Sequence, residues 1–280
     1  MKRTLLIILA LMGFFTLLPA NPVLTEQEEE AINALLEYRL FVSTLPGDEA
    51  VAKLISYKTK NSEDSSTYGF SEEVSLVLDA FIELDILSYY QTLDSKDPKI
   101  QEIAESQYKT LQAWIDNHKN ETPNKWTYCM AAEAFDWYLA YLPLTQILAK
   151  GLLPKKYYTY ALDQDPEMSY ALSGLAQWQY YAPVFAGGGN KASKTSFTKA
   201  IASAKTDPDE YVARLFYSQL LFETKNYDEA ESQLQAAESI YPGSKRLARF
   251  RQMNNLGYSW FEFARDYEDN RAKLSKPLVY

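Results

Sequence analysis

The chain has 280 residues, with 28 basic and 37 acidic side chains, one cysteine and one histidine. The acidic balance disfavours nucleic acid and anionic lipid surfaces as partners, because like charges repel. One cysteine and one histidine cannot form an internal disulfide, the usual zinc cages or a Ser-His-Asp or Cys-His arrangement, so we expect no enzyme, no metal and no cofactor.

Residues 1–20 have the layout of a secretory signal peptide. Lys2 and Arg3 precede an apolar run over residues 4–18, and Ala20 ends the segment. The run is short for a membrane span, which needs about 20 residues. We therefore expect a bacterial exported protein, periplasmic or secreted, that is soluble after cleavage. An uncleaved N-terminal anchor is the less favoured alternative.

The rest of the chain reads as helices. Apolar residues recur at spacings of three and four, and strand-like alternation is rare. We divide the chain into an N-terminal hairpin at 21–60, a helical array at 71–266 and a loosely attached tail at 267–280, with a polar loop at 61–67 as the boundary. Helices are expected at 25–43, 47–58, 71–93, 98–119, 125–149, 152–163, 166–181, 190–204, 208–224, 227–240 and 244–266.

Several helix starts carry recognisable caps. Thr25 and Glu28 have the spacing of a capping box, and Ser71 precedes two glutamates. Asp-Pro pairs at 97–98, 165–166 and 207–208 each predict a capping carboxylate before a proline in the first helical turn. His118 is expected to meet the last carbonyls of a helix. Cys129 is expected to be a buried, unreactive thiol.

The clearest repeated pattern lies between Tyr211 and Pro242. Ala230, Leu234 and Ala237 follow the turn at offsets of four and three, and Pro242 comes five residues later. This spacing resembles a tetratricopeptide repeat, in which small residues let two helices approach closely. Weaker copies surround Ala161 and Ala200. The resemblance implies an all-α, tetratricopeptide-like solenoid of helical hairpins with degenerate repeats, closed by a C-terminal capping helix at 244–266 whose alternative role is partner binding.

The segment YYAPVFAGGGNKASKT, residues 180–195, interrupts the helices. It differs by one residue from a phosphate-binding loop, with Ser193 in place of the second glycine and no strand before it, so we expect no nucleotide. We expect instead a turn in which the helix ends near Ala182, residues 187–189 reverse the chain and Asn190 caps the next helix. The segment resembles exported bacterial repeat proteins that include the helical T component of tripartite ATP-independent periplasmic (TRAP) transporters.

In tetratricopeptide repeats the first helix of each pair lines the concave face. The resemblance places these ligand or partner candidates there: Trp178, Tyr181, Leu215, Gln219 and Phe222. It implies a non-enzymatic periplasmic scaffold that binds protein partners, among them a solute-binding protein of a TRAP-type transporter, and contacts an apolar or organic-acid ligand. The alternative is an envelope-assembly or outer-membrane maintenance factor that binds extended peptides.

Overall fold

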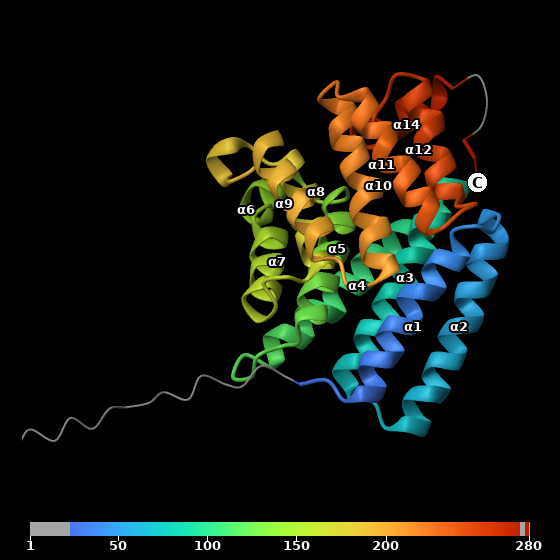
Figure 1. The fold of residues 1–280 in the computed structure, drawn as a ribbon. Coiled ribbons are helices and arrows are strands. Elements are labelled where there is room, and N and C mark those ends of the chain that lie inside the picture. The colour runs from blue at the N-terminus through green and yellow to red at the C-terminus, as the bar shows by residue number, and fades with distance from the viewer. Residues whose placement is uncertain (1–22, 275–277, 280) are drawn as a thin grey trace, which may run out of the picture.

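The structure is a computed structural model that describes residues 23–274, 278 and 279 (Figure 1). The predicted signal peptide at 1–20 lies outside the described residues. The described part of the chain is helical and contains no strand. No helix in it is long and apolar enough to cross a bilayer. Its elements are α1 (Glu26–Val42), α2 (Gly47–Tyr68), α3 (Glu72–Leu93), α4 (Pro98–Asn117), α5 (Lys125–Leu139), α6 (Leu144–Lys150), α7 (Leu153–Gln164), α8 (Ser169–Tyr181), the 3-10 helix η1 (Val184–Ala186), α9 (Asn190–Ser203), α10 (Asp207–Glu223), α11 (Tyr227–Ile240), α12 (Lys245–Asn255), α13 (Trp260–Arg265) and α14 (Tyr267–Ala272).

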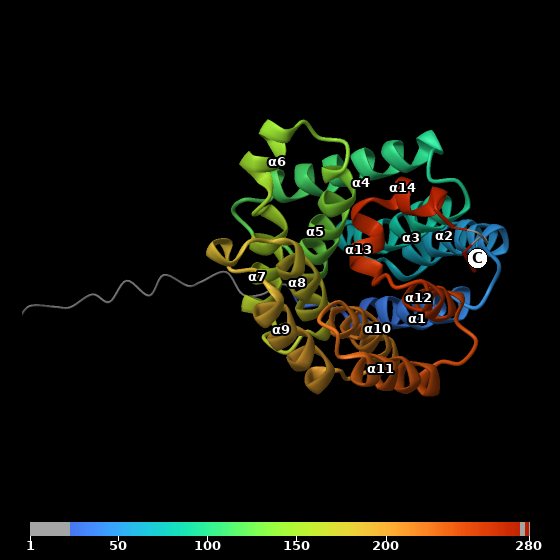
Figure 2. The same cartoon turned by 90° about the horizontal axis from the view of Figure 1, so that it is seen from above.

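The helices pack as hairpins around a ring, which confirms the predicted all-α, tetratricopeptide-like solenoid. Helices α1, α3, α5, α8 and α10 form an inner layer in which neighbours contact one another, and α2, α4, α7, α9 and α11 pack outside them (Figure 2). Helix α10 also contacts α1, so the last inner helix returns to the first. We call these five helices the inner ring.

Helix α12 covers the end of the array and joins it to the α1–α2 turn and to α3. On the array side, Arg251 pairs with Glu238 of α11 at 2.6 Å. On the other side, the Ser43 carbonyl accepts the Lys245 N–H at 2.7 Å, and Arg249 donates to the Thr92 hydroxyl at 2.7 Å. These contacts hold the two ends of the solenoid together.

Four predicted boundaries are wrong. The expected loop at 61–67 continues α2 to Tyr68, with Asn61 buried. Pro143 separates α5 from α6 where one helix was expected. The expected helix at 244–266 divides at Gly257, whose φ of 92° is left-handed, and α13 follows. The expected loose tail contains α14 and a buried Leu278, which packs with Phe263.

The predicted caps are mostly correct. Thr25 and Glu28 form the capping box, and the Glu28 carboxylate also accepts the Ser71 N–H at 2.8 Å, which ties the start of α1 to the start of α3. Asp97 caps α4. The other two Asp-Pro pairs differ from the prediction. Asp165 follows the end of α7 and pairs with Lys125 at 2.7 Å, whereas Thr206 is the cap of α10.

The glycine-rich segment is a turn between α8 and α9. Helix α8 ends at Tyr181, and Gly187 and Gly189 have φ values of 92° and 95°. Gly189 occupies the cap position, so the prediction that Asn190 caps α9 is wrong. Ser193 donates to the Ala176 carbonyl at 2.7 Å and fastens α9 to α8. The residue that breaks the phosphate-loop pattern therefore has a packing role.

Gly188→Ala is expected to lower the free energy of unfolding by about 1–3 kcal/mol. A Cβ at this position would overlap the backbone carbonyl of Ala182, which cannot rotate away as a side chain can. Gly47→Ala is the control, because its Cβ would meet the movable side chain of Leu93 at 3.0 Å. Urea unfolding of the two variants measures the difference. Equal midpoints would show that the turn does not need glycine at residue 188.

Candidate functional site

A buried ion pair crosses the inner ring from α1 to α3. The Arg39 guanidinium donates to both oxygens of Asp85, with Nε–Oδ2 and Nη2–Oδ1 distances of 2.6 and 2.9 Å. The same guanidinium lies 4.9 Å from the centre of the Phe81 ring. The bidentate geometry fixes both side chains.

A second polar pair joins α8 to α5 beside the first. The Tyr170 hydroxyl donates to the Glu133 carboxylate at 2.5 Å, and the Tyr170 ring packs edge-on against Phe81 at 5.5 Å. Burial raises the pKa of Glu133, and the nearby Arg39 charge partly offsets that rise. Burial and the Glu133 charge raise the pKa of Tyr170 well above its ordinary value. A small cavity of about 30 Å³ between Arg39, Tyr170 and their neighbours has room for about one water molecule.

Asp136 lies one helical turn after Glu133 and makes no side-chain hydrogen bond or ion pair in the described part of the chain. Solvent reaches its side chain, yet enclosure by the surrounding protein, together with the Glu133 charge, raises its pKa well above the ordinary value. Asp136 in turn raises the pKa values of Tyr158 and Tyr181, where burial is the larger cause. Two acids of α5 with raised pKa values thus lie near a group of phenols on α7 and α8. Such a combination of groups can hydrogen-bond a polar head group beside aromatic rings.

Asp136→Asn is expected to stabilise the protein above about pH 5 and to leave its stability unchanged near about pH 3. The folded state raises this pKa above 3.8, so it disfavours the carboxylate, and the stability of the wild type falls as pH rises through the folded pKa. Because solvent screens the side chain, we expect a gain of at most about 1 kcal/mol. Thermal unfolding across that pH range measures it. A gain that is the same at every pH would contradict an origin in the carboxylate charge.

The structure does not bring the five sequence-predicted candidates together. Trp178 is buried and donates its indole N–H to the Gly151 carbonyl at 3.0 Å, so it faces the α6–α7 connection and not the concave face. Phe222 packs edge-on against Tyr227 at 4.9 Å, within the α10–α11 hairpin. Leu215 and Gln219 lie on the inner helix α10 as predicted, but both are fully buried. Tyr181 is the one exposed member.

Helix α13 covers this part of the concave face. Seen from above, it lies over the middle of the ring (Figure 2). The Gln219 side-chain oxygen accepts the Trp260 N–H at 2.8 Å, and the Tyr181 hydroxyl donates to the Phe261 carbonyl at 3.1 Å. Phe261 stacks on Tyr180 with ring centres 4.5 Å apart. Gln219 is therefore unavailable to a partner while α13 is in place, and Leu215 is buried among side chains of α1, α11 and α12.

Sequence reasoning missed Arg39, Glu133 and Asp136. A signal was present, because Glu133 and Asp136 are isolated acids in the otherwise apolar segment WTYCMAAEAFDWYLAYLPL. The predictions for the lone histidine and cysteine are confirmed: the His118 ring lies 2.8 Å from the Trp114 carbonyl, and Cys129 is fully buried. Among the described residues, no three His, Cys, Asp or Glu side chains are placed to hold a metal ion.

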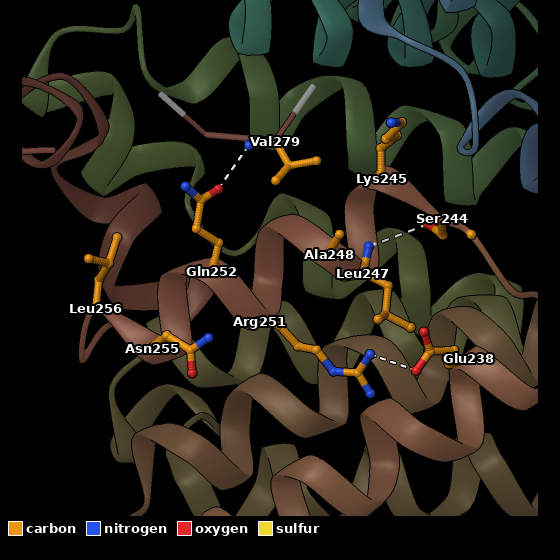
Figure 3. Close-up of a pocket in the computed structure, with 11 residues that line it drawn as sticks. Glu238, Ser244, Lys245, Leu247, Ala248, Arg251, Gln252, Asn255, Leu256 and Val279 are labelled. Atoms are coloured by element: carbon orange, nitrogen blue, oxygen red, sulfur yellow. Dashed lines mark hydrogen bonds and ion pairs between the residues drawn. The ribbon is translucent and has the colours of Figure 1, made fainter. Parts of the chain in front are cut away.

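A wider groove of about 540 Å³ runs beside α12 (Figure 3). Its polar groups largely satisfy one another, since Arg251 pairs with Glu231 and Glu238, and the Val279 N–H donates to the Gln252 side chain at 2.8 Å. The groove offers few unpaired polar groups and lies outside the inner ring. We therefore do not assign it as the site.

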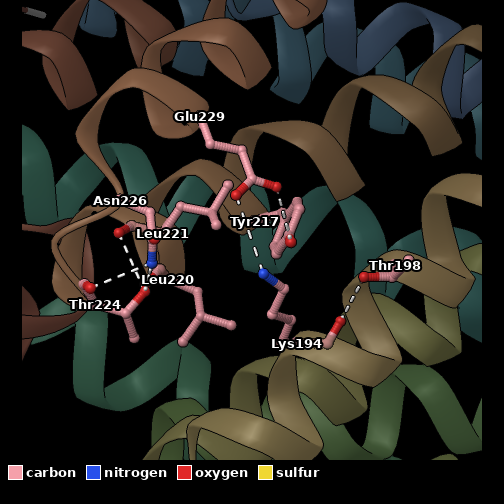
Figure 4. Close-up of polar contacts among 8 residues, drawn as sticks. All are labelled: Lys194, Thr198, Tyr217, Leu220, Leu221, Thr224, Asn226 and Glu229. Carbon is pink, nitrogen blue, oxygen red and sulfur yellow. Dashed lines mark hydrogen bonds and ion pairs between the residues drawn. The ribbon is translucent and has the colours of Figure 1, made fainter.

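The α9–α10–α11 region has the close packing of a helical repeat. Ala230, Leu234 and Ala237 are all buried against α10 and its neighbours, as their spacing predicts. Polar contacts link the same three helices: Glu229 accepts from the Tyr217 hydroxyl at 3.4 Å and lies 4.0 Å from the Lys194 ammonium (Figure 4).

Residues 195–253 match the family described as tetratricopeptide repeat. The match covers most of α9, all of α10 and α11, and most of α12. No curated protein matches the sequence. The repeat assignment therefore applies to this segment, and the surrounding hairpins extend the same architecture in space.

Proposed function

We propose that this chain is a non-enzymatic protein-interaction scaffold, with the tetratricopeptide repeat of residues 195–253 as the premise. Such repeats generally mediate protein–protein interactions. The observation that carries the proposal is the binding of α13 to the concave face. Gln219 and Tyr181 hold the backbone N–H of Trp260 and the backbone carbonyl of Phe261, which are groups that any polypeptide segment offers.

The finer proposal is a periplasmic scaffold that partners a solute-binding protein of a TRAP-type transporter. Its support is the resemblance of residues 180–195 to the exported T component. The carboxyl of Asp136 and the phenols of Tyr158 and Tyr181 support a role in contacting an organic ligand, because such groups can hydrogen-bond a polar head group while aromatic rings cover its apolar part.

The occupied concave face also favours the second candidate, a factor that binds extended peptides during envelope assembly. A peptide would replace the contacts that α13 makes with Gln219 and Tyr181. The two candidates differ in the partner that binds, because one needs a folded solute-binding protein and the other needs an unfolded segment.

Isothermal titration with each partner tests both candidates. A purified TRAP-type solute-binding protein is titrated into the protein, and an unfolded outer-membrane protein segment is titrated separately. Saturable binding of the solute-binding protein at micromolar or lower concentration supports the first candidate, and selective binding of the unfolded segment supports the second. Tyr181→Phe, which removes one backbone contact, should change peptide binding more than binding of the folded partner. If neither partner binds, the scaffold proposal is rejected.

A further inference from the structure

Exposed apolar side chains lie on α6, on the α6–α7 connection and on η1. Helix α6 has no buried residue, and Leu144, Leu148 and Leu152 follow one another at spacings of four, each more than half exposed. Val184 and Phe185 of η1 are 79% and 94% exposed. We call these five side chains the α6–η1 corner.

The α6–α7 connection and the α8–α9 turn, which contains η1, lie near each other in space. The Lys155 ammonium, at the start of α7, donates to the Ala186 carbonyl at 2.8 Å. Trp178 of α8 donates to the Gly151 carbonyl at 3.0 Å. These bonds hold the α6–α7 connection against the α8–α9 turn, and both segments project at the upper left of Figure 1.

The corner is also the basic part of an acidic chain. Residues 137–206 contain seven lysines and three acidic residues, although acidic residues outnumber basic ones in the chain as a whole. The three acids lie at 163–167, near the far end of α7 from the corner, so about 12 residues of helix, or roughly 18 Å, separate them from it. That distance exceeds the Debye length of about 8–10 Å at physiological salt. Within residues 137–206, the charges nearest the corner along the chain are therefore those of lysines.

Four lysines lie on the same segments as the apolar side chains or directly beside them in sequence. Lys150 ends α6, Lys155 and Lys156 begin α7, and Lys191 begins α9 directly after the turn; all but Lys155 are exposed. Apolar tips surrounded by lysines are typical of protein segments that lie in the interface of an anionic bilayer, where the tips enter the acyl boundary and the ammonium groups reach lipid phosphates. A stable protein interface instead needs about 800 Å² of surface on each partner. Five apolar side chains on two short segments offer little surface for a stable protein interface.

We propose that the α6–η1 corner inserts its apolar side chains into the surface of an anionic phospholipid bilayer. The net negative charge of the whole chain predicts repulsion from such a surface. The lysines near the corner lie apart from most of the acidic residues along the chain, and they offset this repulsion locally. This role is independent of the scaffold function, since the corner lies outside the inner ring. It would hold the scaffold beside a membrane through α6 and η1.

A fluorescent label at the corner tests insertion directly. Val184→Cys gives a reactive thiol for an environment-sensitive dye. Cys129 should not react, because it is fully buried and burial raises the pKa of its thiol. With vesicles in which about a quarter of the lipid is phosphatidylglycerol, we expect a blue shift of the emission that weakens as salt rises. Vesicles of phosphatidylcholine alone should give at least about tenfold weaker binding. The dye reports the surroundings of residue 184. A chain held on the vesicle only through residues 4–18 would therefore leave its emission water-like.

Matched variants of the labelled protein separate the apolar and basic contributions. Leu148→Glu should weaken binding at least about tenfold, and Lys156→Gln about fivefold, as expected for one lysine near an anionic surface. Ile55→Glu, on exposed α2 away from the corner, is the control and should bind like the parent. Unchanged thermal unfolding confirms folding of each variant. An emission that stays water-like with every vesicle overturns the proposal. So does a Leu148→Glu variant that binds vesicles normally but no longer binds a solute-binding protein, because the corner would then be a protein interface.

Discussion

Replacing Arg39 by methionine is expected to lower the free energy of unfolding by about 3–5 kcal/mol. The Arg39 and Asp85 side chains are 16% and 8% exposed, so the mutation leaves a carboxylate buried without its counter-charge. It also removes the cation held 4.9 Å from the Phe81 ring. Urea unfolding followed by circular dichroism measures the loss. The large effect follows from the unpaired charge that remains and not from a large net contribution of the pair.

The double variant Arg39→Met with Asp85→Leu distinguishes these two explanations. If the unpaired carboxylate causes the loss, removing it should restore most of the stability, since apolar replacements of buried pairs are often neutral. Lys60→Met is the exposed control: its pair with Asp64 has side-chain exposures of 66% and 35%, and we expect a change below about 0.5 kcal/mol. A double variant as unstable as Arg39→Met alone would contradict the explanation.

Local spacing was sufficient to predict most of the helices. The Ala230, Leu234 and Ala237 pattern predicts close contact with α10, and all three residues are buried there. The expected loop at 61–67 failed because polar composition alone does not end a helix. Lys60 pairs with Asp64 one turn later, and the Thr67 hydroxyl bonds to the Glu63 carbonyl, so these polar residues are accommodated within α2.

Ring closure could not be predicted, because it depends on contacts between distant residues. The hydroxyls of Ser43 and Ser244 meet at 3.1 Å although 201 residues separate them. No repeat spacing encodes that contact. It depends on the curvature that accumulates over every hairpin of the array.

The candidate site was predicted only in part, because it too depends on contacts between distant residues. Leu215 and Gln219 lie on the inner helix α10, but repeat spacing could not show that α13 folds back over Gln219. The polar residues Arg39, Glu133 and Tyr170 come from three different helices and meet only when the ring forms. Their assembly is a property of the closed array and not of any one repeat.

Phe261→Ala is expected to lower the free energy of unfolding by about 3–5 kcal/mol and to release α13 from the concave face. Phe261 is 1% exposed and stacks on Tyr180, so truncation leaves a cavity beneath α13. Phe263 stays buried and Trp260 still stacks on Phe250 at 5.4 Å, so the loss of the Phe261 ring weakens the attachment of α13 without removing every contact. Hydrogen exchange should therefore quicken across residues 259–265 before global unfolding.

Phe185→Ala provides the matched control for this loss. Phe185 is 94% exposed, so the same truncation should change stability by less than about 0.5 kcal/mol and leave exchange at 259–265 unaltered. If α13 occupies a peptide-binding face, its release in Phe261→Ala should also tighten the binding of an added unfolded segment. The added peptide then no longer competes with α13 for that face. Faster exchange without tighter binding would show that α13 is a structural part of the ring and not a stand-in for a partner. Unchanged exchange would show that the remaining contacts suffice to hold it.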